Sequence, residues 1–247
     1  MKLRKMIAAA ALALAVPLSA FAGPPFMTDD PEPVELHHWE VYLASAFSHG
    51  GGDTFFTAPH VEVNYGILPE TQLHMIVPMA YSSSRGPGAH YGFSDMELGV
   101  KYRFLQEGEL LPQAGVFPLV ELPTGDSRNG LGGGHVRVFI PVWLQKSFGA
   151  WTSYGGGGWW YNPGAGNRDY WFGGWLLQRD ISKSLTVGAE IFGSTRQAQG
   201  EGGSYGFNAG AIINLSEEHH ILLSAGRDIH GPNTVAAYAA FQWTFGP

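Results

Sequence analysis

Charged side chains alternate with apolar ones between residues 95 and 104, and they are the first candidates for chemistry in this sequence. The charged members are Asp95, Glu97, Lys101 and Arg103. Side chains two residues apart point to the same face of a β-strand, so this spacing would place two acids and two bases on one face. Such a face could orient a solute in a charged constriction, or its acids and bases could pair with neighbours as internal salt bridges.

Four more charged residues occupy equivalent positions in other alternating stretches: Glu62, Glu121, Arg137 and Glu190. Together, the eight residues are predicted to line one interior. Because an unpaired charge in a narrow interior is costly, we expect acids and bases to pair whether or not they also contact a solute. We therefore favour the salt-bridge interpretation and keep the constriction as the alternative.

Other chemistry finds less support. The sequence contains no cysteine, which excludes disulfides, thiolate metal sites and cysteine nucleophiles. The pairs His37-His38 and His219-His220 begin predicted strands at one end, but adjacent strand residues point to opposite faces, so we expect no metal site. Glycine clusters at 130–134 and 155–158 lack the Lys-Ser/Thr that follows a phosphate-binding loop. We expect no cofactor.

An outer-membrane hydrolase is the enzyme class to consider. A barrel phospholipase would carry a serine two residues after a histidine on one strand face, and no histidine here has that neighbour. A Ser, His and Glu set assembled from different strands stays open as a less favoured alternative. The sequence thus predicts a protein that is not an enzyme.

The elements that must position these residues are strands. The two-residue period recurs twelve times, near residues 38–47, 60–67, 72–79, 95–104, 114–122, 136–145, 150–162, 170–179, 185–191, 207–215, 220–229 and 234–245. Short connections alternate with longer, glycine-rich ones, as they do in outer-membrane barrels. The prediction is an all-β protein: a single antiparallel up-and-down transmembrane β-barrel of about 12 strands, with short periplasmic turns and longer extracellular loops.

The chain divides into three parts. Residues 1–22 have a basic start, a short apolar stretch and Ala20-Phe21-Ala22, and they are predicted to be a signal peptide. Residues 23–34 are rich in proline and acid, and we expect an extended, weakly ordered periplasmic lead-in. Residues 35–247 are predicted to be the outer-membrane β-barrel.

Composition supports a membrane barrel. Charged residues make up 14% of the chain, against about 25% in an ordinary soluble domain, while aromatic residues reach 13%. Aromatic residues gather near the predicted strand ends, which favours two interfacial girdles; these include Trp159, Trp160, Tyr161, Tyr170 and Trp171 near a long loop. The alternative is a soluble β-sandwich with core aromatics. Net charge is −7 and no basic patch suggests nucleic acid.

Two sequence features constrain the interior. Pro59, Pro78, Pro118 and Pro141 fall inside predicted strands, so each must lie at a bulge, a bend or a strand start. Apolar residues such as Ile76, Phe139 and Trp143 occupy inward positions. A barrel of about 12 strands is intermediate between filled small barrels and open porins, so we expect a narrow, partly occluded lumen.

Several short motifs resemble those of the outer-membrane family named for the meta pathway of phenol degradation. They are Gly23-Pro24-Pro25-Phe26, Thr28-Asp29-Asp30-Pro31, Val77-Pro78, the strand from Gly92 to Phe104, Leu122-Pro123-Thr124-Gly125 and Ser224-Ala225-Gly226-Arg227. The resemblance covers the whole mature chain. It implies a β-barrel and a role in passing small, often aromatic or apolar, compounds.

These observations predict an outer-membrane channel or transporter that passes small molecules by passive diffusion. Its expected partners are outer-membrane lipid and lipopolysaccharide, a small-molecule solute, and the barrel-assembly machinery during biogenesis. The alternative is a structural or surface-interaction barrel whose lumen is closed.

Overall fold

The computed structural model describes residues 24–84 and 88–247. The predicted signal peptide, residues 1–22, lies outside the described residues. Within them, no helix is long and apolar enough to cross a membrane. The only helical element in the described ranges is a single 3₁₀ turn, η1, at Ser127–Asn129.

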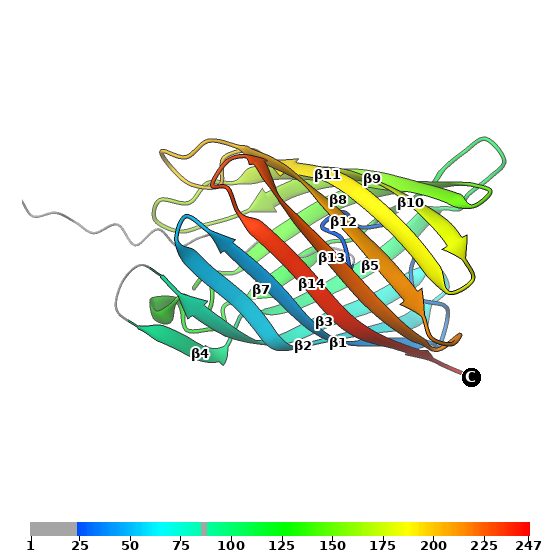
Figure 1. Cartoon of the computed structure of the whole chain (residues 1–247), viewed down its shortest axis with the longest axis horizontal. Coiled ribbons are helices and arrows are strands. Elements are labelled where there is room, and N and C mark those ends of the chain that lie inside the picture. Colours follow the sequence, from blue (N-terminus) through cyan, green and yellow to red (C-terminus); the bar gives the residue numbers. More distant parts are fainter. Residues whose placement is uncertain (1–23, 85–87) are drawn as a thin grey trace, which may run out of the picture.

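The structure is a closed antiparallel barrel (Figure 1). Its strands are β1 (Trp39–Gly50), β2 (Asp53–Leu68), β3 (Thr71–Ser83), β4 (Ala89–Phe93), β5 (Met96–Leu105), β6 (Gln113–Val116), β7 (Leu119–Leu122), β8 (Arg137–Phe148), β9 (Trp151–Tyr161), β10 (Tyr170–Ser182), β11 (Leu185–Ser194), β12 (Ser204–Asn214), β13 (His219–His230) and β14 (Val235–Phe245). β1 pairs with β14, which closes the sheet, and the other strands pair in sequence order except around β4 to β7. The predicted all-β barrel is confirmed.

Fourteen strand segments form twelve spans, because two spans are interrupted. β4 and β5 both pair with β3, and β6 and β7 both pair with β5 and β8. The second interruption falls at Phe117-Pro118, where proline cannot donate to the ladder. On the adjacent strand Pro141 lies between Phe139, paired with Leu119, and Val142, paired with Val116. The two prolines thus lie at neighbouring positions of one gap in the pairing between β6–β7 and β8.

The other two prolines are also accommodated locally. Pro59 coincides with register shifts on both sides of β2, between Ala44 and Ala46 on β1 and between Thr57 and His60 toward β3. Pro78 lies where the neighbour of β3 changes from β5 to β4. Each proline that the sequence placed inside a strand therefore lies at an irregularity of the wall, where its missing backbone N–H interrupts no regular ladder bond.

Connections at the two ends differ in length. The end with the C-terminus has mostly tight turns, such as the two-residue connections at 69–70 and 183–184, and we call it the short-turn end. The opposite, long-loop end carries the connections 123–136, 162–169 and 195–203. One connection expected to be long is short: β1 and β2 extend to a two-residue turn, Gly51-Gly52. Both glycines have left-handed φ angles, +63° and +96°.

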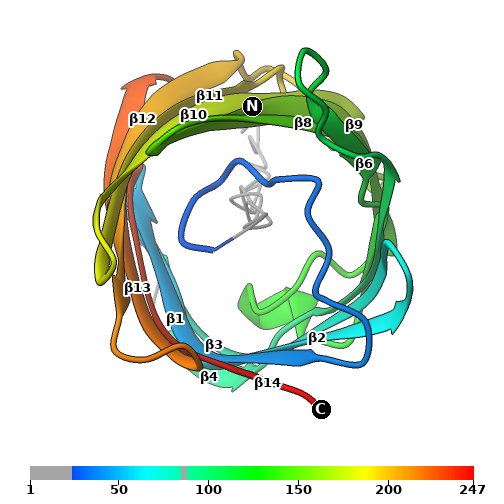
Figure 2. The ribbon, with the colours of Figure 1, turned by 90° about the vertical axis from the view of Figure 1, so that its right-hand side faces the viewer.

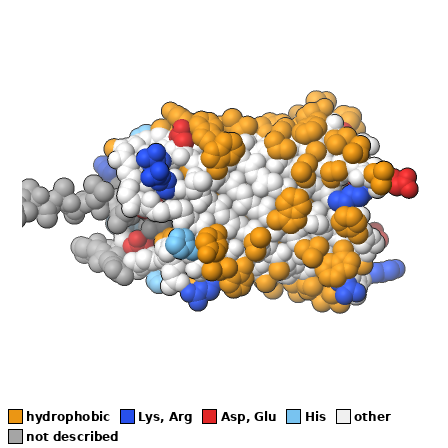
Figure 3. Space-filling view, turned by 90° about the horizontal axis from the view of Figure 1, so that it is seen from above, with side chains coloured by type: hydrophobic (Ala, Val, Ile, Leu, Met, Phe, Trp, Pro, Cys, Tyr) orange, Lys and Arg blue, Asp and Glu red, His pale blue; other side chains and the backbone are white. Residues whose placement is uncertain are grey.

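The outer wall is apolar. Hydrophobic side chains cover much of the surface in Figure 3, and charged side chains lie toward its two ends. Exposed aromatics include Trp39, Trp151 and Trp243 near the short-turn end and Tyr161 and Trp171 near the other. Trp160 and Tyr170 were expected in the outer girdle, but they are buried inside the barrel. Each is one residue out of phase with its exposed neighbour, so it points inward.

The chain before β1 turns into the barrel (Figure 2). We call residues 24–34 the inner segment. Phe26, Met27, Thr28 and Asp29 are buried, with at most 6% of their surface exposed. This corrects the expectation of a weakly ordered periplasmic lead-in. Composition suggested disorder, but the segment is ordered by bonds to strands that lie far away in the sequence.

A second segment, the loop 123–136, also folds inward at the long-loop end (Figure 2). Asp126 accepts a hydrogen bond from the Arg128 backbone N–H and caps η1, and Gly130 ends it with a left-handed φ of +68°. Leu131 is 4% exposed and anchors the loop as its buried apolar residue. The interior is therefore entered by chain segments from both ends.

Candidate functional site

The lumen has one predominantly polar wall. Inward side chains of β2, β3 and β5 form a buried hydrogen-bonded network around His74. Its ring nitrogens lie 2.7 Å from Asn64 Oδ1 and 3.0 Å from Glu97 Oε1, and Asn64 Nδ2 donates to Glu62 Oε1 at 2.9 Å. Two predicted lumen residues, Glu62 and Glu97, are thus joined through one imidazole and one amide.

The wall formed by β7 to β10 is aromatic. A buried cluster contains Phe117, Leu119, Phe139, Trp143, Trp160 and Tyr170. Phe139 and Trp160 stack with their ring centroids 4.7 Å apart. The guanidinium of Arg137 lies 4.7 Å from the Trp160 ring centroid and donates to Glu121 Oε2 at 2.7 Å. This arrangement combines an ion pair with a cation–π contact, so both charges are compensated inside the barrel.

Asp95 fastens the inward loop 123–136. Its Oδ1 accepts from the Gly125 N–H at 2.9 Å and its Oδ2 accepts from the Gly133 N–H at 2.6 Å. A Cβ on Gly132 would lie 2.2 Å from Asp95 Oδ1, so the loop comes this close only because residue 132 is glycine. The carboxylate therefore serves as an anchor for the loop.

Glu190 fastens the inner segment on the opposite arc. Its two carboxylate oxygens accept from the backbone N–H groups of Met27 at 2.7 Å and Thr28 at 2.8 Å. Asn208 Nδ2 donates to the same carboxylate at 3.0 Å. Glu190 is 3% exposed, so these three donors replace the water that a buried carboxylate needs.

Lys101 fastens the same segment from the polar wall. Its Nζ lies 3.0 Å from Asp29 Oδ1 and 3.5 Å from Asp30 Oδ1. The ammonium also lies 5.0 Å from the centroid of the Phe117 ring. Lys101 and Asp29 are both buried, at 6% and 1% exposure, and each compensates the charge of the other.

Glycines on the inner wall make room for the inner segment. A Cβ on Gly188 or Gly210 would each lie 2.9 Å from the Phe26 ring. A Cβ on Gly174 would lie 2.1 Å from Thr28 Oγ1, and one on Gly115 would lie 3.0 Å from Pro31. Side chains at these positions would displace the segment, so the wall is shaped to hold it.

Arg103 lies apart from the other seven predicted residues, at the short-turn end. It pairs with Glu70 in the β2–β3 turn at 2.5 Å, and its Nη1 donates to Gln113 Oε1 at 2.8 Å. The structure thus brings Glu62 near Glu97 and Glu121 near Arg137, and it engages Asp95, Lys101 and Glu190 with chain segments. None of these contacts shows a solute role.

Glu70→Gln is expected to lower stability slightly at neutral pH. The hydrogen bond from Arg103 holds the pKa of the Glu70 carboxyl below its ordinary 4.5. Its stabilisation is therefore complete above pH 4.5 and is lost as pH falls through the lowered value. Because Glu70 is 28% exposed, screening limits the effect to about 0.5 kcal/mol. Thermal unfolding in detergent at pH 7 and pH 3 measures it; an undiminished difference at pH 3 would contradict the assignment.

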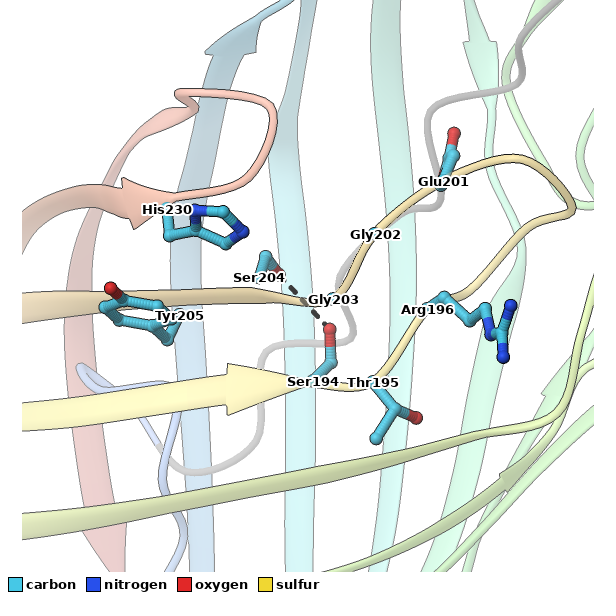
Figure 4. Close-up of a pocket in the computed structure, with 9 residues that line it drawn as sticks. All are labelled: Ser194, Thr195, Arg196, Glu201, Gly202, Gly203, Ser204, Tyr205 and His230. Carbon is cyan, nitrogen blue, oxygen red and sulfur yellow. Dashed lines mark hydrogen bonds between the residues drawn. The ribbon is translucent and has the colours of Figure 1, made fainter.

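Two open cavities lie near opposite ends of the barrel. The larger, of about 670 Å³, lies at the long-loop end between the β11–β12 loop and the end of β13. Figure 4 shows its lining, with His230 beside Tyr205, and a hydrogen bond between the hydroxyls of Ser194 and Ser204. The smaller, of about 360 Å³, is lined by Glu32, Arg103 and neighbouring polar residues at the short-turn end.

The histidine pairs have protein partners. The ring of His219 stacks on Trp243 with centroids 6.3 Å apart, and His220 Nδ1 lies 2.8 Å from Asn214 Oδ1. His37 Nδ1 lies 3.3 Å from the Tyr65 hydroxyl. In residues 24–84 and 88–247, no group of three or more His, Cys, Asp or Glu could hold a metal ion.

Sequence reasoning missed the inner segment and its partners. Phe26 and Met27, two large apolar residues between prolines and acids, were the available signal. Gln72, which accepts from the Val34 N–H at 2.9 Å, and Gln145, which donates to Glu32 at 3.1 Å, carried no signal of their own. Both occupy ordinary inward positions, and only their distance to the segment reveals their role.

No protein-family model matches this sequence, and no curated protein matches it. Solved structures do. An outer membrane channel from Pseudomonas putida F1 is 16% identical, with TM-score 0.66 over 87% of this chain and 98% of that one. The NanC porin is 6% identical, with TM-score 0.58 over 82% and 98%. The CymD monoaromatic hydrocarbon channel is 7% identical, with TM-score 0.50 over 86% and 89%. At these identities the likeness shows a shared fold.

Proposed function

We propose that this protein is an outer-membrane channel that passes small molecules by passive diffusion. The observation that carries the proposal is the lumen itself: a polar wall adjoins an aromatic wall, and the inner segment and the loop 123–136 are held to the barrel by a few polar contacts. A structural barrel would be expected to fill its interior with its own packed side chains. The solved structures with this fold include proteins described as channels and porins, which supports the proposal.

The solutes proposed are small and include aromatic or apolar compounds. The aromatic wall offers stacking surfaces, and the polar wall offers hydrogen bonds to a substituent. The resemblance to the phenol meta-pathway family and the name of the CymD channel point to the same class. The apolar outer wall, its exposed aromatics and the predicted signal peptide support location in the outer membrane, with short turns toward the periplasm.

The inner segment and the loop 123–136 both fold into the lumen in this structure, so we infer that passage requires at least one of them to move. The occlusion also favours the second candidate, a structural or surface-interaction barrel. Swelling of liposomes that contain the purified protein separates the two. Permeability to small aromatic alcohols above that of protein-free liposomes supports a channel. Absence of permeability both in the natural protein and in variants with released segments would sink it.

Asp95→Ala is expected to raise permeability at least threefold. The change removes the carboxylate that accepts hydrogen bonds from two backbone N–H groups of the loop 123–136. Each such bond to a charged acceptor contributes about 1–3 kcal/mol to holding the loop. The loop should then leave the lumen more often. Asp126→Ala is the matched control, because it removes an acid of the same loop that bonds only within the loop. Equal swelling rates for the two variants would contradict the role of Asp95.

A further inference from the structure

We propose that the lumen holds a binding site for a small aromatic carboxylate, and that Phe26 and Asp29 of the chain itself occupy this site in the structure. The inference deepens the proposed function, on which it rests, by naming a solute class. Three features carry it: a recess shaped for one aromatic ring, a buried cation that the same segment contacts three residues further along, and a mode of attachment that a free ligand could replace.

The recess for the ring is built from the barrel wall. Phe26 is 2% exposed and packs with Tyr154 and Leu176 in a buried cluster of their own. Gly188 and Gly210, which pair with each other across β11 and β12, leave the space that the ring fills. An aromatic ring is the group that this combination of two flat glycine positions and two large apolar side chains accepts.

The cation for the carboxylate is Lys101. Its ammonium is buried and bonds to Asp29 at 3.0 Å, and the face of Phe117 lies on another side of it. Asp29 follows Phe26 by three residues, so the Cα atoms that carry the ring and the carboxylate lie at most about 10 Å apart. A small molecule can carry both groups on one short linker.

The contacts between the inner segment and the barrel wall are of the kinds that a bound ligand makes. The segment is joined to the wall here by hydrogen bonds, an ion pair and ring packing, all of which can exchange for those of a solute. Asp29 Oδ2 and Thr28 Oγ1 of the segment and Asn208 Oδ1 of the wall are buried and have no hydrogen-bond partner among the described residues. The segment and the wall therefore do not satisfy each other completely, which lowers the cost of exchanging the segment for a ligand.

The test uses the full chain in detergent and the double variant Phe26→Ala/Asp29→Asn, which vacates the recess and neutralises the competing carboxylate. Isothermal titration with 3-phenylpropionate is expected to show binding at least tenfold tighter than to the natural protein. The neutral probe 3-phenylpropan-1-ol should bind the double variant at least tenfold more weakly than the acid does. Adding Lys101→Met to the double variant should weaken the binding of the acid at least tenfold and leave the affinity for the alcohol unchanged.

Equal binding of acid and alcohol, retention of acid binding by the Lys101→Met triple variant, or no binding of either probe would overturn the proposal. Lys101→Met is tested only together with Asp29→Asn, so that no buried carboxylate is left without its partner. A difference in gel migration between unboiled and boiled samples checks folding, and Phe26→Ala alone provides a second background if the double variant fails. Liposome permeability is measured separately: selective binding without permeation would refute the channel, and permeation without charge selectivity would refute only this site.

Discussion

Glu190→Ala is expected to open the lumen, with an open probability in single-channel recordings at least tenfold above that of the natural protein. The alanine leaves the backbone N–H groups of Met27 and Thr28 without their acceptor, whereas Asn208 of the wall keeps a bond to Ser224. Two buried donors that lose a charged acceptor together cost the docked segment about 2 kcal/mol or more. That is roughly thirtyfold in the ratio of docked to undocked states.

Two comparisons make the Glu190 result specific. Glu190→Gln keeps one acceptor oxygen, so it should open the lumen less than alanine does. Glu217→Ala is the matched control, because it removes an exposed carboxylate in a turn outside the lumen. Its recordings should match those of the natural protein. An unchanged open probability in Glu190→Ala, with folding intact, would mean that Glu190 does not hold the segment.

Gly158→Val is expected to prevent folding, lowering the yield of heat-modifiable barrel at least tenfold. A Cβ at this position would lie 2.3 Å from the Ile140 carbonyl oxygen and 2.4 Å from the Pro141 Cα. Both are backbone atoms of the paired strand β8, which cannot move aside without breaking the ladder. The cost should exceed about 3 kcal/mol, the upper range for overpacking.

Gly202→Val is the matched control for that substitution. No atom lies within 4 Å of a Cβ built on Gly202, and its φ is not in the left-handed region. The control should therefore fold with the natural yield and melting temperature. If both valine variants fold equally well, the close approach of β8 and β9 is not required.

Much of the wall could be predicted from the sequence. The alternation in residues 96–104 and 136–145 places each side chain because a strand has a strict period of two and the outside of the barrel is apolar. The same period puts Glu97, Lys101 and Arg137 inward. It also explains the error at Trp160 and Tyr170, which were grouped with the girdle by residue type instead of by phase.

The contents of the lumen could not be predicted in the same way. The inner segment has no periodic pattern, and its order depends on Glu190 and Lys101, which lie 162 and 72 residues away from Thr28 and Asp29. The fastening of the loop 123–136 by Asp95 likewise depends on one carboxylate meeting two backbone N–H groups. Such contacts are set by the curvature and register of the closed sheet, and a single strand carries no trace of them.

The inner segment has a mechanical consequence. It is bonded to Gln72 on β3, Lys101 on β5, Glu190 on β11 and Ser224 on β13, so it joins arcs of the wall that no strand pairing connects. A hollow tube can be flattened by lateral pressure from its surroundings, whereas an internal strut resists that deformation. The cross-section of this barrel should therefore be round and stiff while the strut is in place and should become oval and compliant once it is withdrawn.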